Sequence, residues 1–366
     1  MCNRLNTYLL LVPCLIAALL VVVPAYPATT QPPGWPWRGV NMDSISSTPA
    51  DIHTLIARLG VNSVHLQIRP NKLGDRRGLD ASQAWQAALK WVDAMLLECK
   101  KERIVGIVEV SGVPIDGITK TNPQNALAFW HSSRQRGEYF ERISSLAHHL
   151  AKFGNEFAAY DVMSEPVTVE NHQAVRPPDW FKFQSQIITT IREVDPNRWI
   201  VVTPGPLGES AGYRDFSPLP FSRLVYSIHM YDPHAYTSQG ITRFQFGVKY
   251  PGMINGTWWD KLTLEADMSP VIQFQEKYNT LIYVGEFSAL RWSPGAESYI
   301  KDLVSIFNSY NWGWAYFAYN GWNGWNPNYN ADYSTNASDV DRDYVGVKSK
   351  RWATLRQILP IKRSEN

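Results

Sequence analysis

Two glutamates in apolar surroundings are the residues of this sequence best suited to acid–base or nucleophilic chemistry. Glu165 lies near the end of the run FAAYDVMSEP (residues 157–166), and Glu286 near the end of LIYVGEF (281–287). Both runs have the composition of buried strands, where an ionised carboxylate costs several kcal/mol unless it is paired or used. Two carboxyl groups whose surroundings hold their pKa values apart can serve as acid and as nucleophile or base, the combination that cleaves a glycosidic bond.

Eight short apolar, β-branched or aromatic runs could position this pair. They lie near residues 38–42, 61–69, 104–110, 157–163, 199–203, 224–231, 281–287 and 312–319. Several are apolar nearly throughout, which is typical of strands buried on both faces of a parallel sheet. Stretches of helical period lie between them, including residues 49–60, 80–100, 134–152 and 177–194. The pattern predicts a single-domain (β/α)8 TIM barrel, in which both glutamates end strands on the face that carries chemistry.

Composition is compatible with a large folded domain and gives little sign of a charged partner. The 366 residues are 45% hydrophobic, enough for a sizeable core, and the formal charge of +2 indicates no basic face for nucleic acid. The chain has 15 Trp and 18 Tyr, whose rings could stack on sugars while their polar atoms reach sugar hydroxyls. We expect a monomer with a carbohydrate partner and no nucleic acid.

The N-terminus has the pattern of a secretory signal. Arg4 precedes a mostly apolar run over residues 8–23, and Val23-Pro24-Ala25 is a plausible cleavage site. We therefore predict a signal peptide and short leader over residues 1–28, a catalytic domain over 29–366, and a secreted or periplasmic protein without a membrane segment after cleavage. An uncleaved anchor is the alternative, although the run is shorter than the about 20 residues that span a bilayer.

Five markers that occur in order along the chain resemble glycoside hydrolase family 5, the cellulase-like group whose catalytic glutamates end strands four and seven. The resemblance covers about residues 38–358. The markers are RGVN at the first run (38–41), Arg69 after the second, Glu165-Pro166 after YDVM, His229-Met230-Tyr231 at the sixth and Glu286 within VGEF.

The resemblance implies a retaining hydrolase of β-glycosidic bonds in a poly- or oligosaccharide. Glu165 would be the acid/base and Glu286 the nucleophile of a double displacement. Arg69 and Tyr231 would hydrogen-bond the Glu286 carboxylate, and His229 would face the sugar or Glu165. Arg69 as an ordinary ion-pair partner, and His229 and Tyr231 as core residues, remain alternatives. We expect no cofactor and no metal.

The remaining expected substrate-binding residues include departures from the family pattern. Asn41 belongs to the RGVN marker of the first run, and Ser164 stands where the family has an asparagine that contacts the 2-hydroxyl of the bound sugar. The third run ends with Glu109 where relatives often carry histidines. Tyr319 aligns with a tryptophan that floors the sugar site in the family, and Trp322 or Trp325 in the following loop could replace it.

Two other functions remain open from these residues. One is a barrel that binds glycans without cleaving them, which the Ser164 substitution and the altered eighth run favour. The other is a transglycosylase that uses the same two glutamates.

Overall fold

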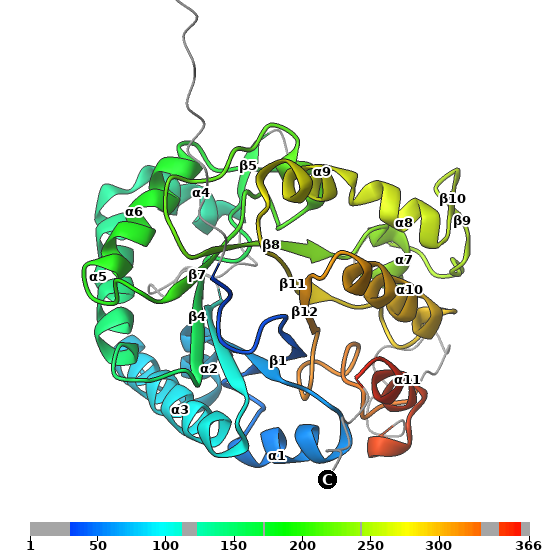
Figure 1. Cartoon of the computed structure of the whole chain (residues 1–366), viewed down its shortest axis with the longest axis horizontal. Coiled ribbons are helices and arrows are strands. Elements are labelled where there is room, and N and C mark those ends of the chain that lie inside the picture. The colour runs from blue at the N-terminus through cyan, green and yellow to red at the C-terminus, as the bar shows by residue number, and fades with distance from the viewer. Residues whose placement is uncertain (1–29, 112–122, 171–172, 242–243, 331–343, 360–366) are drawn as a thin grey trace, which may run out of the picture.

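Eight parallel strands close into a barrel at the centre of the molecule (Figure 1). The structure, a computed structural model, describes residues 30–111, 123–170, 173–241, 244–330 and 344–359. The barrel order is β1-β12-β11-β8-β7-β4-β3-β2. The strands are β1 (Arg38–Asp43), β2 (Ser63–Ile68), β3 (Val105–Val110), β4 (Phe157–Val162), β7 (Trp199–Val202), β8 (Leu224–Met230), β11 (Ile282–Phe287) and β12 (Gly313–Tyr316). Each predicted run overlaps one of them, so the predicted (β/α)8 barrel is confirmed.

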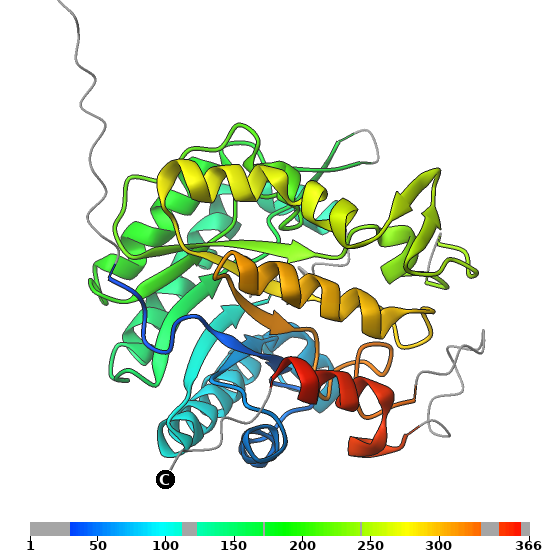
Figure 2. The same cartoon turned by 45° about the vertical axis from the view of Figure 1, so that its right-hand side comes forward.

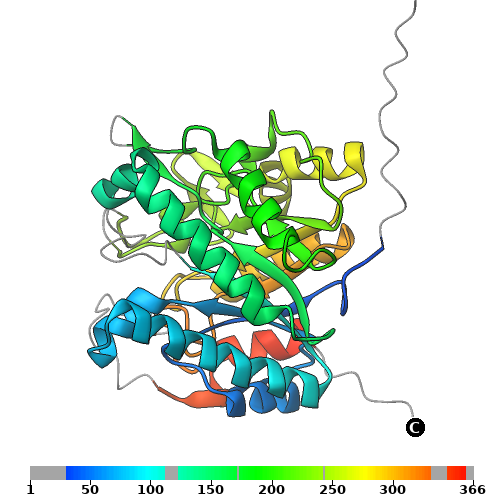
Figure 3. The same ribbon diagram turned by 90° about the vertical axis from the view of Figure 1, so that its left-hand side faces the viewer.

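Helices surround the strands on the outside of the barrel (Figure 1). They are α1 (Pro49–Arg58), α2 (Pro70–Arg77), α3 (Ala81–Glu102), α4 (Pro123–His131), α5 (Ser133–Leu150), α6 (Trp180–Arg192), α7 (His234–Thr237), α8 (Lys261–Asp267), α9 (Ser269–Tyr278), α10 (Ala296–Ser309) and α11 (Lys350–Ile358). The long helices α3 and α5 lie across one side of the barrel (Figure 3). The four predicted helical stretches are confirmed, and within the last of them α6 begins at Trp180.

Local sequence explains where the best-defined helices begin. The carboxylate of Asp80 accepts a hydrogen bond from the backbone N–H of Gln83, and the side-chain oxygen of Gln83 accepts one from the backbone N–H of Asp80. These two bonds form the capping box that starts α3. Thr48 and Asp51 form the corresponding box at α1, where Pro49 occupies the first turn. These caps satisfy backbone donors that the helices themselves leave free.

The barrel interior contains an apolar layer and a polar layer. Side chains two residues apart on a strand share a face, so Ile107 and Glu109 of β3 point the same way, as do Ala159 and Asp161 of β4. The apolar layer forms a hydrophobic cluster that is separate from the core between strands and helices, and it includes Trp37, Val105, Ile107, Ala159, Val201, Val225, Tyr283 and Ala315. The polar layer lies nearer the strand C-terminal ends and includes buried Asn41, His65, Gln67, Glu109, Asp161 and His229.

Two small hairpins extend the connections that leave the strand C-terminal ends. β5 (Thr168–Glu170) pairs with β6 (Gln173–Val175), and β9 (Gly252–Ile254) pairs with β10 (Thr257–Trp259). The second hairpin projects beyond the tip of β8 (Figure 2). Both insertions therefore lie on the barrel face where the two candidate glutamates end their strands.

The predicted signal peptide, residues 1–28, lies outside the described residues. In the part of the chain that the structure describes, none of the helices combines the length and the apolar character needed to cross a bilayer.

Candidate active site

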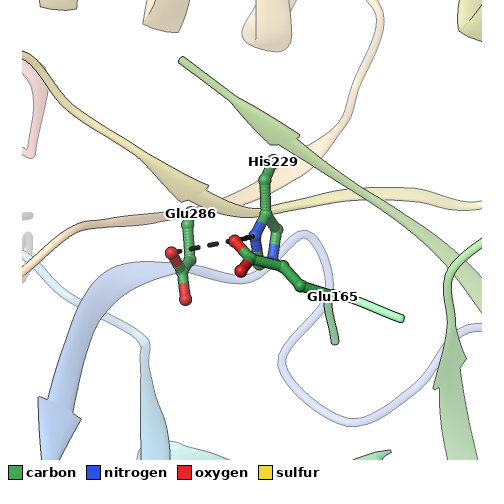
Figure 4. A group of neighbouring side chains, drawn as sticks. All are labelled: Glu165, His229 and Glu286. Atoms are coloured by element: carbon green, nitrogen blue, oxygen red, sulfur yellow. Dashed lines mark hydrogen bonds and ion pairs between the residues drawn. The ribbon is translucent and has the colours of Figure 1, made fainter. Parts of the chain in front are cut away.

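The barrel brings Glu165, His229 and Glu286 together although the two glutamates are far apart in sequence (Figure 4). The three residues have potential ligand atoms that all lie within 4.8 Å of one another. Glu165 keeps 19% of its side chain exposed, whereas the side chain of Glu286 is 7% exposed. The two carboxyl groups therefore share a site but differ in their access to water.

The end of β4 turns Glu165 into the site. Met163, directly after the strand, has a φ of 60°, in the left-handed region that non-glycine residues rarely adopt. Its side chain is buried, and Pro166 follows Glu165 and disfavours helix at that position. The strand pairing ends at Val162, three residues before the glutamate.

A β-bulge at Gly285 directs Glu286 toward Glu165. β11 has one residue more than β8 between two paired positions, because Val284 pairs with Ile228 while Glu286 pairs with His229. Bulges often redirect side chains next to active sites. A Cβ atom at Gly285 would stand 3.0 Å from the Ser227 hydroxyl and 3.2 Å from His229 Nε2. Only glycine therefore fits here without displacing those neighbours.

Both oxygens of Glu286 accept hydrogen bonds that favour its ionised form. The Tyr231 hydroxyl donates to Oε2 at 2.9 Å, and the Gln67 amide donates to Oε1 at 2.7 Å. Burial, and then the negative charges of Glu286 and Glu165, raise the pKa of Tyr231 well above its ordinary value. Tyr231 therefore remains a hydrogen-bond donor, as expected for its predicted contact with Glu286.

His229 connects the two glutamates. Its Nδ1 is 2.8 Å from Glu165 Oε1 and 3.7 Å from Glu286 Oε2, and its side chain is 1% exposed. Of the two expected placements of His229, facing the sugar or facing Glu165, the structure has the contact with Glu165.

Arg69 and Ser164 reach the site by partners that the sequence did not predict. The Arg69 guanidinium donates to Oε1 of Gln67, and the amide nitrogen of Gln67 donates to Glu286. These hydrogen bonds connect Arg69 to the nucleophile candidate through Gln67. The Ser164 hydroxyl is 1% exposed and donates to Glu109 at 2.7 Å. The expected contact of Ser164 with a sugar therefore differs from the contact in the structure, because its hydroxyl is directed at Glu109 in the polar layer of the barrel interior.

Asn41 and Tyr319 also differ from their expected roles as substrate contacts. Asn41 is fully buried, and its amide donates to the Gly285 carbonyl at 2.8 Å, so it supports the bulge. Tyr319 is 5% exposed, its hydroxyl donates to Asp51, and its ring packs against Trp352. β12 ends at Tyr316, so Tyr319 lies beyond the strand and turns outward instead of flooring the site.

Phe317, which the sequence interpretation missed, takes the place expected for Tyr319. Its half-exposed ring lies 6.3 Å from the ring of Tyr231 and 6.2 Å from that of Trp325. Trp322 is 46% exposed and packs against Trp325 at 6.1 Å, so the predicted Trp322 belongs to the outer edge of this aromatic group. Period-two alternation from Ala315 would place Phe317 and Tyr319 on the same face, so it could not have separated the two, and both lie beyond the end of β12.

Three further polar residues underlie the site and were not assigned a function from sequence: His65, Gln67 and Asp161. His65 Nε2 lies 3.3 Å from Asp161 and 3.5 Å from Glu109. Burial opposes charge on His65 most strongly, but the bond to Asp161 and the charges of Glu109, Asp161 and Glu286 outweigh it and raise its pKa. The sequence signal that could have identified these three residues is the presence of isolated polar residues within apolar strand runs.

Glu165, His229 and Glu286 are of types that can bind a metal ion, and their spacing would permit one. Nδ1 of His229, however, is already in contact with Glu165. The geometry is equally that of a carboxylate pair bridged by a histidine, which needs no ion.

The chain is similar in sequence to known cellulases. The family model Cellulase (glycosyl hydrolase family 5) matches residues 27–323. Endoglucanase C of Acetivibrio thermocellus is 23% identical over 258 residues, which cover 62% of this chain and 71% of that protein. Endoglucanase C307 of a Clostridium species has the same identity and coverage.

Solved structures share the fold. A crystal structure described as a glycoside hydrolase superposes with a TM-score of 0.67 at 18% identity, covering 88% of this chain and 99% of that one. Endoglucanase Cel5A from Thermotoga maritima has a TM-score of 0.63 at 16% identity, with coverage of 88% and 97%. At these identities the likeness concerns the barrel itself.

Proposed function

Because the chain belongs to the cellulase family, glycosyl hydrolase family 5, we propose that it cleaves internal bonds of a β-glucan with retention of configuration. Family membership makes the chain an O-glycosyl hydrolase that acts on β-glycosidic bonds. The names of its relatives, endoglucanases, support a β-glucan and internal cleavage. The observation that carries the mechanism is the proximity of the Glu165 and Glu286 carboxyl groups.

The separation of the two carboxyl groups favours retention over inversion. Retaining enzymes hold the two groups about 5–5.5 Å apart, and inverting enzymes about 6.5–9.5 Å apart to admit a water molecule. Oxygen atoms of Glu165 and Glu286 lie within 4.8 Å of each other. This short distance fits direct attack on the sugar better than attack by an intervening water.

The surroundings support Glu286 as nucleophile and Glu165 as acid/base. Glu286 accepts bonds from Tyr231 and Gln67, which favours the ionised form needed to attack the anomeric carbon. Glu165 would give its proton to the leaving oxygen as the glycosyl ester forms. It would then take a proton from the water that hydrolyses the ester, because the negative charge of Glu286 has gone.

Two variants test these roles. We expect Glu286→Gln to abolish turnover of soluble β-glucans, since no ester can form. We expect Glu165→Ala to lose about 10²–10⁴-fold on glucans but to retain much of its ester formation from a dinitrophenyl glycoside, whose leaving group needs no proton. Glu156→Gln is a matched control, because the side chain of Glu156 is only 9% exposed. Glu156 directly precedes the N-terminal end of β4, whereas Glu165 follows the C-terminal end of this strand.

The stereochemical course tests the proposal independently. Proton NMR of the first product should show the β-anomer before mutarotation. Early α-anomer, or full activity of Glu286→Gln, would overturn the double displacement through Glu286.

We further propose that residues 1–28 comprise a signal peptide, cleaved after Val23-Pro24-Ala25, and a short leader, and that the catalytic domain, residues 29–366, works outside the cytoplasm. The apolar run over residues 8–23 supports this interpretation. Intact mass of the protein recovered from culture medium or periplasm should correspond to a chain that begins near residue 26. A full-length chain held in the membrane fraction would instead support the anchor.

A further inference from the structure

Gln67 occupies an unusual position between two buried carboxylates. Its Nε2 lies 2.7 Å from Glu286 Oε1 and 2.6 Å from Glu109 Oε2, and its Oε1 accepts a bond from Arg69. An amide nitrogen has two hydrogens, and each can be donated to one carboxylate. These partners also determine the amide orientation, because the opposite flip would direct its oxygen at both carboxylates. The side chain is 1% exposed, so water does not compete for these bonds.

Glu109 extends this connection to the other catalytic strand. Its Oε1 accepts the hydroxyl of Ser164, which directly precedes Glu165, at 2.7 Å. Buried hydrogen bonds therefore link Glu286 to Gln67, Gln67 to Glu109, and Glu109 to Ser164. The chain of bonds begins on β11, crosses the barrel interior to β2, and continues to β3 and the end of β4. β11 and β4 are not neighbours in the barrel, so strand pairing alone does not join them directly.

This network can maintain the spacing between the two glutamates. Each charge-assisted bond is shorter and stronger than a neutral one, and all four residues are at most 5% exposed. Tyr231 holds the second oxygen of Glu286, so Gln67 and Tyr231 together determine the plane of that carboxylate. Removal of Gln67 would leave Glu286 and Glu109 without this shared donor in a buried site, which disfavours the ionised form of both.

We propose that Gln67 is a positioning residue that holds Glu286 ionised and oriented, with Glu109 as its anchor and Arg69 acting through it. This inference depends on the proposed function, because it assigns a purpose to the carboxylate of the nucleophile. Gln67 does not need to touch the substrate.

The test is the pH dependence of covalent labelling of the nucleophile in Gln67→Leu. A 2-deoxy-2-fluoro glycoside of a β-glucan disaccharide with a dinitrophenyl leaving group traps the glycosyl ester, and its rate reports the ionised nucleophile. In the pH–rate profile of labelling, we expect the acidic limb to shift to higher pH by about one to two pH units. The loss of one charge-assisted hydrogen bond implies a shift of this size. At the pH optimum of the wild type, turnover should fall about 10–100-fold.

Gln184→Leu is the matched control. Gln184 is 3% exposed and donates to the Thr203 carbonyl, so its loss also removes a buried amide, but from helix α6. The control should lose stability without a shift of the acidic limb. Gln67→Asn, which keeps an amide too short to reach both carboxylates, should shift the limb in the same direction and provides the measurement if the leucine variant does not fold.

The outcomes separate this inference from the proposed function. Labelling of a residue other than Glu286 in the wild type would overturn both. Labelling of Glu286 with the same acidic limb in wild type, Gln67→Leu and Gln67→Asn would overturn the role of Gln67 alone.

Discussion

The bulge at Gly285 predicts that a single added methyl group lowers turnover as well as stability, whereas the same change elsewhere in the barrel lowers stability alone. In Gly285→Ala the new Cβ would stand 3.0 Å from Ser227 Oγ, 3.2 Å from His229 Nε2 and 3.4 Å from His229 Cδ2. The first two distances are shorter than ordinary van der Waals contacts. The serine and the histidine ring must therefore move by a few tenths of an ångström.

The displaced ring bears directly on Glu165. His229 Nδ1 lies 2.8 Å from Glu165 Oε1, and the bulge also supports Glu286, the next residue. Overpacking of a core costs about 1–3 kcal/mol of stability. Weakening a hydrogen bond to a charged group costs about 1.5–3 kcal/mol, which corresponds to a roughly 10–100-fold loss of kcat at 1.4 kcal/mol per tenfold.

Gly313→Ala separates the two effects. Its Cβ would meet Trp35 at 3.1 Å and Tyr283 at 3.2 Å, which is similar crowding at the start of β12 and away from the glutamates. Urea unfolding should show comparable destabilisation of both variants, while steady-state kinetics on a soluble β-glucan should show loss of kcat in Gly285→Ala alone. Equal kcat in the two variants, at equal loss of stability, would refute the positioning role of the bulge.

Two further predictions concern the aromatic group and the pH dependence of stability. Phe317→Ala should raise KM on short β-glucan oligosaccharides by roughly 5–30-fold, as loss of about 1–2 kcal/mol of ring contact implies, while Tyr319→Phe should leave KM unchanged. The reverse pattern in initial-rate assays would restore Tyr319 as the floor. Burial, with the charges of Asp232 and Glu209, raises the pKa of Asp267 from 3.8 to about 6. Between about pH 4 and 6 the native state therefore binds more protons than the unfolded state does. As a result, this carboxyl lowers the free energy of unfolding as the pH rises through that range. Asp267→Asn should therefore be more stable than wild type by about 1 kcal/mol at pH 7, with allowance for solvent screening. In thermal unfolding curves this difference in stability should disappear below about pH 4. The same difference in stability at both pH values would contradict the assigned pKa shift.

The barrel could be predicted from sequence because its strands are nearly continuous apolar runs. Burial on both faces requires that composition, and the eight runs matched the eight strands. The candidate pair could be predicted for the same reason, since Glu165 and Glu286 interrupt apolar runs near strand C-terminal ends. What the structure adds is that their carboxyl groups meet within 4.8 Å.

The direction of side chains beyond a strand end could not be predicted in the same way. Period-two alternation holds only while the strand lasts, and β12 ends three residues before Tyr319. Asn41 and Ser164 were assigned to the substrate from the family resemblance, yet their side chains donate to Gly285 and Glu109 within the barrel. The bulge at Gly285 shifts the alternation by one residue, which apolar patterning does not reveal.

Gln67 illustrates a different limit. A lone glutamine in VHLQI has no meaning until the partners across the barrel are known, and its contact with Glu286 joins residues 219 positions apart. Hydrogen-bond networks of this kind depend on the closed geometry of the barrel and not on local sequence.

The two-layer interior of the barrel implies that stability and chemistry can change independently during evolution. The apolar layer around Trp37 and Tyr283 can exchange hydrophobic side chains of similar volume at little cost. In the polar layer above it, in contrast, we expect Gln67, Glu109 and Ser164 to change as a coordinated set, because hydrogen bonds join them. Combinatorial libraries that vary Gln67, Glu109 and Ser164 together should therefore yield more active variants than libraries that vary them one at a time, and new substrate preferences should arise by joint replacement in this layer.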